Sequence, residues 1–302
     1  ENGMVKRVDG IFVPVVTPFD SENQSVGTEM LEYNIERLNH TDISGYMPLG
    51  SNGESFMMTD DECCRVIAAV KKVAAKEKLI FAGTGRESEY YTIEFTKRIA
   101  QYGVDAVFVL TPHYFPKQMG QDCLRSYYEQ VADRSPVPIL LYQAPAYAAG
   151  VSLETATVAQ LAKHPNIIGM KGTASNTAGC YMEAMDNETS FSILAGTFGA
   201  FCENVRDGAA GGVLSCANYI PHRACELYNL VKAENCQADI LYQKITGLIN
   251  QTTGPLGVGG VKMAMNILGY QGGVTRRPLP YPKESQVRDA RSIFMRGDLE
   301  CR

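Results

Sequence analysis

Eight short apolar runs, each followed by a segment with helical periodicity, constrain the fold of this 302-residue chain more than any other feature. The runs are continuously apolar, which is typical of parallel strands covered on both faces. The sequence therefore predicts eight parallel strands, at Gly10–Val16, Gly45–Leu49, Leu79–Gly83, Ala106–Leu110, Pro138–Tyr142, Ile167–Met170, Phe191–Ala195 and Gly211–Leu214.

The segments between the runs predict helices. Thr59-Asp-Asp-Glu62 is a capping-box pattern, in which two side chains satisfy the first free N–H groups of a helix. Eight strand–helix units with short connections favour an α/β fold of the (β/α)8 TIM-barrel type. The predicted helices are Thr28–Asn39, Glu62–Ala75, Ser88–Tyr102, Gln121–Arg134, Leu153–Lys163, Thr177–Met185, Gly199–Asp207 and Pro221–Lys232.

The main alternative is a doubly wound sheet with a glycine-rich nucleotide loop after its first strand. Val16-Thr-Pro-Phe19 stands at that position, and no Walker sequence occurs in the chain. The run Gly257–Lys262 resembles a phosphate loop at first sight, but its spacing fits no such motif and no strand precedes it. We interpret it as a flexible start of a helix.

The last part of the chain predicts additional C-terminal helices. They lie at Cys236–Thr252, Gly260–Leu268 and Glu284–Phe294. We therefore expect two regions: a catalytic (β/α)8 barrel over residues 1–232 and a C-terminal helical extension over residues 233–302.

Composition excludes several classes of protein. A net charge of -5 argues against a general binder of nucleic acid or of membrane surfaces. No apolar run approaches the roughly 20 residues that cross a bilayer, and neither a secretory signal core nor a mitochondrial targeting segment is visible. Nine scattered cysteines without a C-x-x-C spacing favour reduced thiols and a cytoplasmic location. The four histidines have no metal-ligand spacing.

Lys171 is the residue with the strongest chemical implication. It ends the strand pattern Asn166-Ile-Ile-Gly-Met-Lys171, and a charge at the end of a buried strand is costly unless it is paired, neutralised or used. An uncharged amine is a nucleophile for a ketone, and the product is an imine. The alternative is a lysine whose ammonium reaches solvent.

The other predicted strand ends carry further polar groups, and strand ends hold the active site of a TIM barrel. Gly50-Ser51-Asn52-Gly53 follows the second strand and offers backbone N–H groups to an anion, or else forms only a tight turn. Tyr142 ends the fifth strand, where a positioned phenol can transfer protons or an aromatic ring can simply fill space. Tyr114, Thr173 and Gly196 follow strands four, six and seven.

Four motifs in this order carry a resemblance to a known family: Gly50-Ser-Asn-Gly-Glu54, Tyr114, Tyr142-Gln-Ala-Pro145 and Gly169-Met-Lys171-Gly-Thr173. Together they resemble the dihydrodipicolinate synthase/N-acetylneuraminate lyase family of class I, Schiff-base aldolases. The resemblance extends from Gly10 to about Pro282.

The resemblance implies a role for each matched residue. Lys171 would form an imine with the keto carbon of pyruvate or another 2-oxo acid, and Tyr142 would relay protons. Ser51 and Asn52 would hold the substrate carboxylate, and Tyr114 would complete the relay of a neighbouring subunit. Thr173 would lie near the substrate oxygens, and Gly50 and Gly196 complete the expected substrate-binding set. No metal or organic cofactor is expected, because a protonated imine is itself an electron sink.

The sequence also departs from branches of this family. Synthases that use aspartate semialdehyde resemble one another in a Thr-Thr pair and in an arginine after the Tyr-Asn-x-Pro run. Here Ser51-Asn52 replaces the pair, and residues 146–149 contain no arginine. Sialic-acid lyases have acidic residues after strand seven, where this chain has Thr197-Phe-Gly199. The pattern is most similar to the 4-hydroxy-2-oxoglutarate aldolase branch.

Several functions therefore stay open at this point. The first is reversible cleavage of a 4-hydroxy-2-oxo acid, either 4-hydroxy-2-oxoglutarate or a 2-keto-3-deoxy acid, into pyruvate and a small aldehyde. A 2-keto-3-deoxy sugar-acid dehydratase, a dihydrodipicolinate synthase and a catalytically idle 2-oxo-acid binder are the alternatives. The resemblance also implies a homotetramer built as a dimer of dimers. We expect no nucleic-acid or membrane partner.

Overall fold

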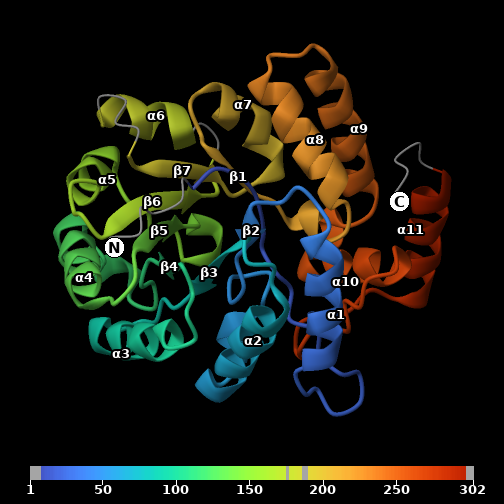
Figure 1. Ribbon diagram of the computed structural model, residues 1–302, viewed down its shortest axis with the longest axis horizontal. Helices are drawn as coiled ribbons and strands as arrows, with labels where there is room; N and C mark the ends of the chain where they lie inside the picture. The colour runs from blue at the N-terminus through green and yellow to red at the C-terminus, as the bar shows by residue number, and fades with distance from the viewer. Residues whose placement is uncertain (1–7, 175–176, 186–189, 297–302) are drawn as a thin grey trace. The chain divides into compact units, whose positions relative to one another are not determined.

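The computed structural model describes residues 8–174, 177–185 and 190–296 (Figure 1). Its eight strands are parallel, each is hydrogen-bonded to the next in chain order, and β8 pairs with β1, so the sheet is a closed barrel. The predicted fold class is confirmed. The strands are β1 (Gly10–Val13), β2 (Gly45–Tyr46), β3 (Leu79–Gly83), β4 (Ala106–Leu110), β5 (Ile139–Gln143), β6 (Ile167–Gly172), β7 (Ser192–Ala195) and β8 (Gly211–Val213).

Strand ends differ from the predictions where backbone chemistry intervenes. β1 ends before Pro14, which has no N–H for a sheet hydrogen bond. β2 is only two residues long, since Pro48 and the left-handed Leu49 (φ 64°) follow closely. β6 extends past the predicted end at Met170, because Lys171 and Gly172 pair with Leu194 and Ala195 of β7.

Eleven α-helices are present in the described residues. The predicted capping box is confirmed: the Thr59 side chain accepts from the Glu62 N–H, and the Glu62 side chain accepts from the Thr59 N–H. The helices are α1 (Thr28–Asn39), α2 (Asp60–Val73), α3 (Glu89–Ala100), α4 (Gln121–Arg134), α5 (Thr155–Leu161), α6 (Thr177–Ala184), α7 (Phe201–Arg206), α8 (Pro221–Lys232), α9 (Gln237–Gln251), α10 (Gly257–Ile267) and α11 (Glu284–Arg296).

The chain forms two compact units. The first contains Glu1–Phe12 and Phe81–Val213, and the second contains Val13–Ile80 and Leu214–Arg302. The expected division at residue 232 into a barrel and a C-terminal extension stays a prediction.

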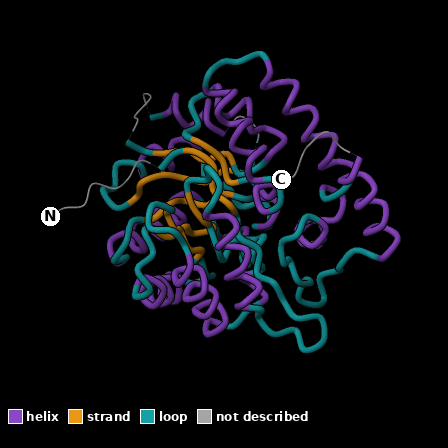
Figure 2. Tube along the Cα trace, turned by 45° about the vertical axis from the view of Figure 1, so that its right-hand side comes forward, coloured by secondary structure: helices purple, strands orange, loops and turns teal. Residues whose placement is uncertain are grey.

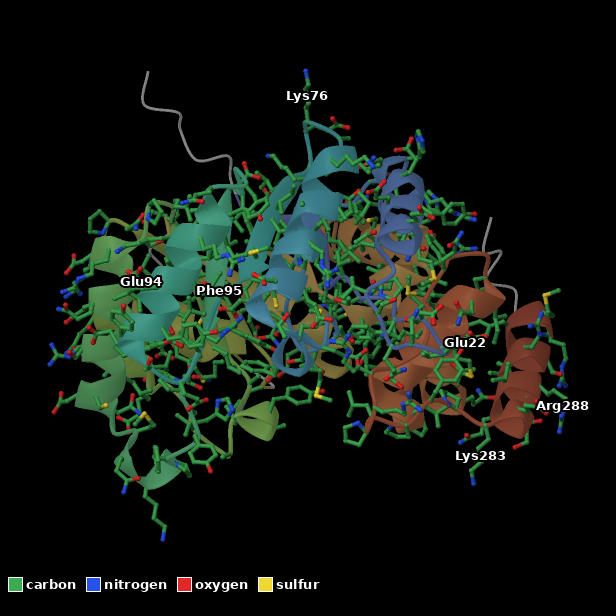
Figure 3. The ribbon with its side chains drawn as sticks, turned by 90° about the horizontal axis from the view of Figure 1, so that it is seen from below. Glu22, Lys76, Glu94, Phe95, Lys283 and Arg288 are labelled. Carbon is green, nitrogen blue, oxygen red and sulfur yellow. The ribbon has the colours of Figure 1, made fainter. Side chains whose placement is uncertain are left out.

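In the first unit, helices α3 to α6 accompany strands β3 to β7 (Figure 1). Figure 2 distinguishes helices in purple from strands in orange. On α3, Phe95 is buried while its neighbour Glu94 points to solvent (Figure 3). The strands supply this unit's core, and β3, β4 and β5 are buried along their whole length. Burial on both faces explains why these strands read as continuous apolar runs.

The second unit contains β2, helices α1 and α2, and α8 to α11. On α11, Phe294 is buried with its ring centroid 6.1 Å from that of Tyr219, whereas Arg288 is exposed (Figure 3). The predicted helix start in the glycine run before Lys262 is confirmed, because α10 begins at Gly257. Its flexibility stays a prediction. A Cβ at Gly260 would lie 2.6 Å from the Thr253 carbonyl oxygen, so glycine serves close packing at the start of α10.

Three observations concern thiols, membrane spans and metal-binding clusters in the described residues. The eight described cysteines are free thiols, five of them buried. No helix among the described residues is both long and apolar enough to span a membrane. In the same residues, no cluster of three or more His, Cys, Asp and Glu side chains could hold a metal ion.

Candidate functional site

Lys171 is a buried lysine in the middle of the first unit's sheet. It belongs to β6, pairs with Tyr142 of β5 and with Leu194 of β7, and is only 4% exposed. The prediction that a buried strand carries this amine is confirmed, and the alternative of a side chain that reaches bulk solvent is wrong. An amine in such a place must be compensated or used.

Two aromatic rings contact the Lys171 side chain. Its Nζ lies 4.4 Å from the ring centroid of Tyr142 and 5.8 Å from that of Phe108. The two rings meet edge to face, with centroids 5.7 Å apart. Side chains alternate between the two faces of a strand, so Phe108 and Leu110 point to the same face. Leu110 pairs with Tyr142 of β5, and the Phe108 and Tyr142 rings therefore lie on the same face of the sheet.

Lys171 has no ion pair with any residue that the structure describes. The faces of these two rings attract a cation, but they supply no opposite charge as a carboxylate would. A second buried lysine, Lys262 on α10, provides the contrast, because its Nζ contacts the Glu54 carboxylate and two carbonyl oxygens. Lys262 is compensated structurally, and Lys171 is not.

The residue after Tyr142 fixes the loop that follows β5. The Gln143 side chain is buried, donates to the Tyr181 hydroxyl at 2.8 Å and accepts from the Leu153 N–H at 2.6 Å. The Tyr181 hydroxyl in turn donates to the Leu153 carbonyl oxygen at 2.7 Å. Burial raises the pKa of Tyr181. This network holds both ends of the segment between β5 and α5, and thereby the position of Tyr142 at its start.

Thr173 and Gly196 lie beside Lys171. The Thr173 N–H and hydroxyl both donate to the Gln143 carbonyl oxygen, at 3.1 and 3.3 Å. The Gly196 N–H donates to the Gly172 carbonyl oxygen at 2.6 Å. A Cβ added to Gly196 would lie 3.2 Å from Cε of Lys171, so glycine leaves room for the lysine side chain. The structure thus brings Lys171, Tyr142, Thr173 and Gly196 together.

Tyr114 is placed differently. Its side chain is 75% exposed, and its ring packs edge to face on Phe115, which is also exposed. The backbone N–H groups of Tyr114 and His113 donate to the Glu87 carboxylate at 2.8 and 2.9 Å, which fixes the loop after β4. The Tyr114 side chain is therefore open to solvent while its backbone is anchored.

The predicted carboxylate-binding loop belongs to the second unit and is tightly held there. Asn52 Nδ2 donates to the Ser215 hydroxyl at 3.0 Å, and Ser51 is half-buried beside the buried Gly50. The loop lies between two left-handed residues, Leu49 (φ 64°) and Glu54 (φ 52°). Residues other than glycine adopt this conformation only where surrounding contacts enforce it.

A buried charge network that the sequence analysis missed supports this loop. The Lys262 and Glu54 side chains are both 0% exposed, and they form an ion pair at 2.5 Å. Burial lowers the pKa of Lys262 to about 8, opposed by the Glu54 carboxylate. The sequence shows an acid that closes the glycine-bracketed loop and a lysine inside an otherwise apolar helix, but neither residue indicates its partner.

The profile of the dihydrodipicolinate synthetase family matches residues 7–294 of the chain. The chain belongs to the dihydrodipicolinate synthetase family. The family that the sequence motifs resembled is thereby confirmed, and the aldolases among its members make this protein a lyase of the class I aldolase type.

Two curated members and one solved structure illustrate the likeness. A mitochondrial protein of Emericella nidulans, named probable 4-hydroxy-2-oxoglutarate aldolase, is 30% identical over 95% of this chain and 94% of its own. An L-threo-3-deoxy-hexylosonate aldolase of Hypocrea jecorina is 28% identical over 92% of each chain. A dihydrodipicolinate synthase family protein of Coccidioides immitis superposes with a TM-score of 0.85 at 27% identity, covering 97% of both chains.

Proposed function

We propose that this protein reversibly cleaves a 4-hydroxy-2-oxo acid into pyruvate and a small aldehyde such as glyoxylate, through an imine on Lys171. The observation that carries the proposal is a lysine only 4% exposed, without an ion pair in the described residues, whose Nζ lies 4.4 Å from the Tyr142 ring centroid. Such an amine suits attack on a keto carbon, because it is buried and uncommitted.

The chemistry needs no external electron acceptor. The Lys171 amine attacks the C2 keto carbon, and loss of water leaves a protonated imine. Removal of the C4 hydroxyl proton then breaks the C3–C4 bond, and its electron pair moves into the imine to give an enamine. The aldehyde leaves, C3 of the enamine takes up a proton, and water hydrolyses the imine to release pyruvate. Proton transfers at the hydroxyl and at the imine are the steps that a positioned acid–base group accelerates.

Tyr142 is the proposed proton carrier and Thr173 the proposed contact to substrate oxygens. Tyr142 lies in register beside Lys171 on the neighbouring strand, so the two side chains share a face of the sheet. Thr173 follows Lys171 by two residues, and its hydroxyl is held at the Gln143 carbonyl oxygen. Gly196 is the proposed spacer that keeps the lysine side chain unobstructed.

Ser51 and Asn52, with Gly50, are the proposed holders of the substrate carboxylate. The proposal rests on the sequence motif and on the chemistry of the loop, whose backbone N–H groups and short polar side chains suit an anion. The fixed conformation of this loop in the second unit supports such a role, because a preformed anion site loses little entropy on binding.

The choice of substrate rests on the residues after Tyr142 and on the names of two relatives. Residues 146–149 provide no arginine for a second carboxylate of aspartate semialdehyde, so a synthase-type condensation is the weaker alternative. The relatives from Emericella nidulans and Hypocrea jecorina are both named aldolases. A 2-keto-3-deoxy acid is the second proposed substrate, with a dehydratase outcome as its variant.

Tyr114 and the assembly are proposed together. A homotetramer of tight dimers would let Tyr114, 75% exposed in its own subunit, complete the proton relay of a neighbour. The test is the molar mass in solution by light scattering, together with the turnover of Tyr114→Phe. A monomeric, fully active protein would contradict this assembly. We propose the cytoplasm as the compartment, and cell fractionation tests it.

A coupled assay for pyruvate release tests the activity. The panel contains 4-hydroxy-2-oxoglutarate, 2-keto-3-deoxy sugar acids, and pyruvate with aspartate semialdehyde in the condensation direction. We expect pyruvate and an aldehyde from 4-hydroxy-2-oxoglutarate, and no turnover by Lys171→Met. A dehydrated 2-oxo acid as product would favour the dehydratase. Binding of pyruvate without any turnover across the panel would refute the enzymatic proposal and favour an idle 2-oxo-acid binder.

A further inference from the structure

A fully buried ion pair fixes the end of the Gly50–Glu54 loop. The Lys262 Nζ donates to Oε1 of Glu54 at 2.5 Å, to the Thr17 carbonyl oxygen at 2.6 Å and to the Val274 carbonyl oxygen at 2.8 Å. An ammonium has three N–H donors, so this one is fully used. The three acceptors come from separate segments of the second unit, and Lys262 therefore ties them together.

The other oxygen of Glu54 completes the network. Oε2 accepts the backbone N–H of Arg276 at 2.9 Å, and the Arg276 guanidinium binds both oxygens of Glu62 at 2.7 Å. Two cations thus face two carboxylates, and the charges of these four groups balance. Arg276 also lies over the ring of Phe19, with its Cζ 4.4 Å from the ring centroid.

The loop itself needs this support, because its backbone is strained at both ends. Leu49 and Glu54 have φ values of 64° and 52°, a left-handed conformation that is strained in a residue with a side chain. Thr17 adds a second tie, since its hydroxyl donates to the Gly53 carbonyl oxygen at 2.7 Å. Gly273, itself at φ 62°, lets the segment after α10 approach the Phe19 backbone.

We propose that the Glu54–Lys262 pair is a positioning device that holds Ser51 and Asn52 in the shape that binds the substrate carboxylate. This role rests on the proposed function of the loop. On this proposal, α10 and the segment that follows it support the Gly50–Glu54 loop, a task that the barrel strands do not perform. Glu54 and Lys262 touch no substrate, and they act through the loop that Glu54 closes.

An ion pair suits this task better than an apolar contact. Buried pairs add little net stability, because desolvation of both charges offsets their attraction. Their hydrogen bonds are directional, however, and removal of one partner leaves an unpaired buried charge. The pair therefore specifies one conformation of the strained loop rather than raising the stability of the fold.

Trapping with cyanoborohydride and two ketones tests the proposal. Pyruvate carries the carboxylate that the loop would bind, and acetone lacks it, so their trapping rates on Lys171 separate carboxylate binding from imine formation. We expect Lys262→Met to lower the trapping rate at limiting pyruvate about 10-fold or more, the usual weight of a lost hydrogen bond to a charged group. The acetone rate should change less than threefold.

A conservative variant and two controls accompany it. Glu54→Gln keeps an acceptor for the Arg276 N–H, and we expect a smaller loss in the same direction. Lys72→Met removes an exposed ion pair with Glu32 (2.7 Å) and should leave both rates unchanged. Ile245→Ala, in the buried core of α9, measures what a loss of stability alone does to the two rates. Hydrogen exchange of residues 49–57 should accelerate in Lys262→Met and not in Lys72→Met.

The outcomes separate the two proposals. If Lys262→Met lowers the trapping rates of pyruvate and acetone equally, as a mere loss of stability would, the positioning role is overturned. Unchanged hydrogen exchange of the loop in Lys262→Met and Glu54→Gln would overturn it as well. A wild-type protein that traps pyruvate while these variants keep its pyruvate-to-acetone ratio refutes the positioning role alone. A wild-type protein that traps no pyruvate on Lys171 refutes the proposed function, and the role of the pair with it.

Discussion

Gly196→Ala is a direct test of how closely the Lys171 side chain is positioned. An added Cβ would lie 3.0 Å from the Gly172 carbonyl oxygen, 3.1 Å from Cγ2 of Thr173 and 3.2 Å from Cε of Lys171. The two backbones are joined by the hydrogen bond from Gly196 to Gly172, so the lysine and threonine side chains must yield. The substitution therefore displaces the amine and alters no charge.

The magnitude follows from the contact distances. Carbon atoms pack at about 3.5–4.0 Å, so Cε of Lys171 has to move by roughly half an ångström. A misplacement of about 1 Å costs on the order of 10²-fold in rate, which makes about tenfold the expected loss here. Overpacking of this size costs about 1–3 kcal/mol of stability, small enough to leave the protein folded.

The assay is the rate of cyanoborohydride trapping of pyruvate, with thermal unfolding measured alongside. Gly199→Ala is the matched control, because it lies in the same loop and its added Cβ would meet no atom within 4 Å. We expect the control to trap pyruvate at the wild-type rate. Equal rates for Gly196→Ala and Gly199→Ala, in a folded protein, would refute the claim that this glycine makes room for a reactive lysine.

Three further predictions address the proton carrier, the charge network and the chemistry. Tyr142→Phe should slow pyruvate release by about 10²-fold or more. Tyr147, which is 65% exposed in the following loop, provides the control, and Tyr147→Phe should release pyruvate at the wild-type rate. Similar rates for the two variants would remove Tyr142 from the mechanism. Hydrogen bonds from Arg276 lower the pKa of Glu62 from 4.5 to about 2, so this contact stabilises the fold fully above pH 4.5 and loses its effect as the pH falls toward 2. In urea unfolding, Glu62→Gln should therefore lose about 1 kcal/mol at pH 7 and nearly nothing near pH 2, and a pH-independent difference would contradict this account. EDTA should leave turnover unchanged, and a sensitive rate would indicate a metal-dependent reaction.

The sequence predicted best what short-range patterns determine. Continuous apolar runs identified all eight strands, because strands that are buried on both faces are apolar at successive positions. Lys171 and Tyr142 were recognised because a charge and a phenol at the ends of such runs are unusual. Their neighbourhood is confirmed by the β5–β6 register, which pairs the two residues directly.

Long-range charge pairing was beyond the sequence. Glu54 and Lys262 lie 208 positions apart, and neither an acid in a loop nor a lysine in a glycine-rich helix start indicates its partner. The close packing of that helix start was hidden for the same reason, because the carbonyl oxygens that pack on its glycines come from other segments. The exposure of Tyr114 likewise depends on how the loop after β4 is anchored by Glu87.

The central claim is that one buried amine captures a keto carbon, and a single peptide map tests it. The protein is incubated with pyruvate and cyanoborohydride, digested, and its lysine-containing peptides are analysed by mass spectrometry. The account predicts a reduced pyruvate adduct on Lys171 at low pyruvate concentration, which is absent from Lys171→Met. Lys262, which is also buried, should stay unmodified. An unmodified Lys171 under saturating pyruvate would contradict it.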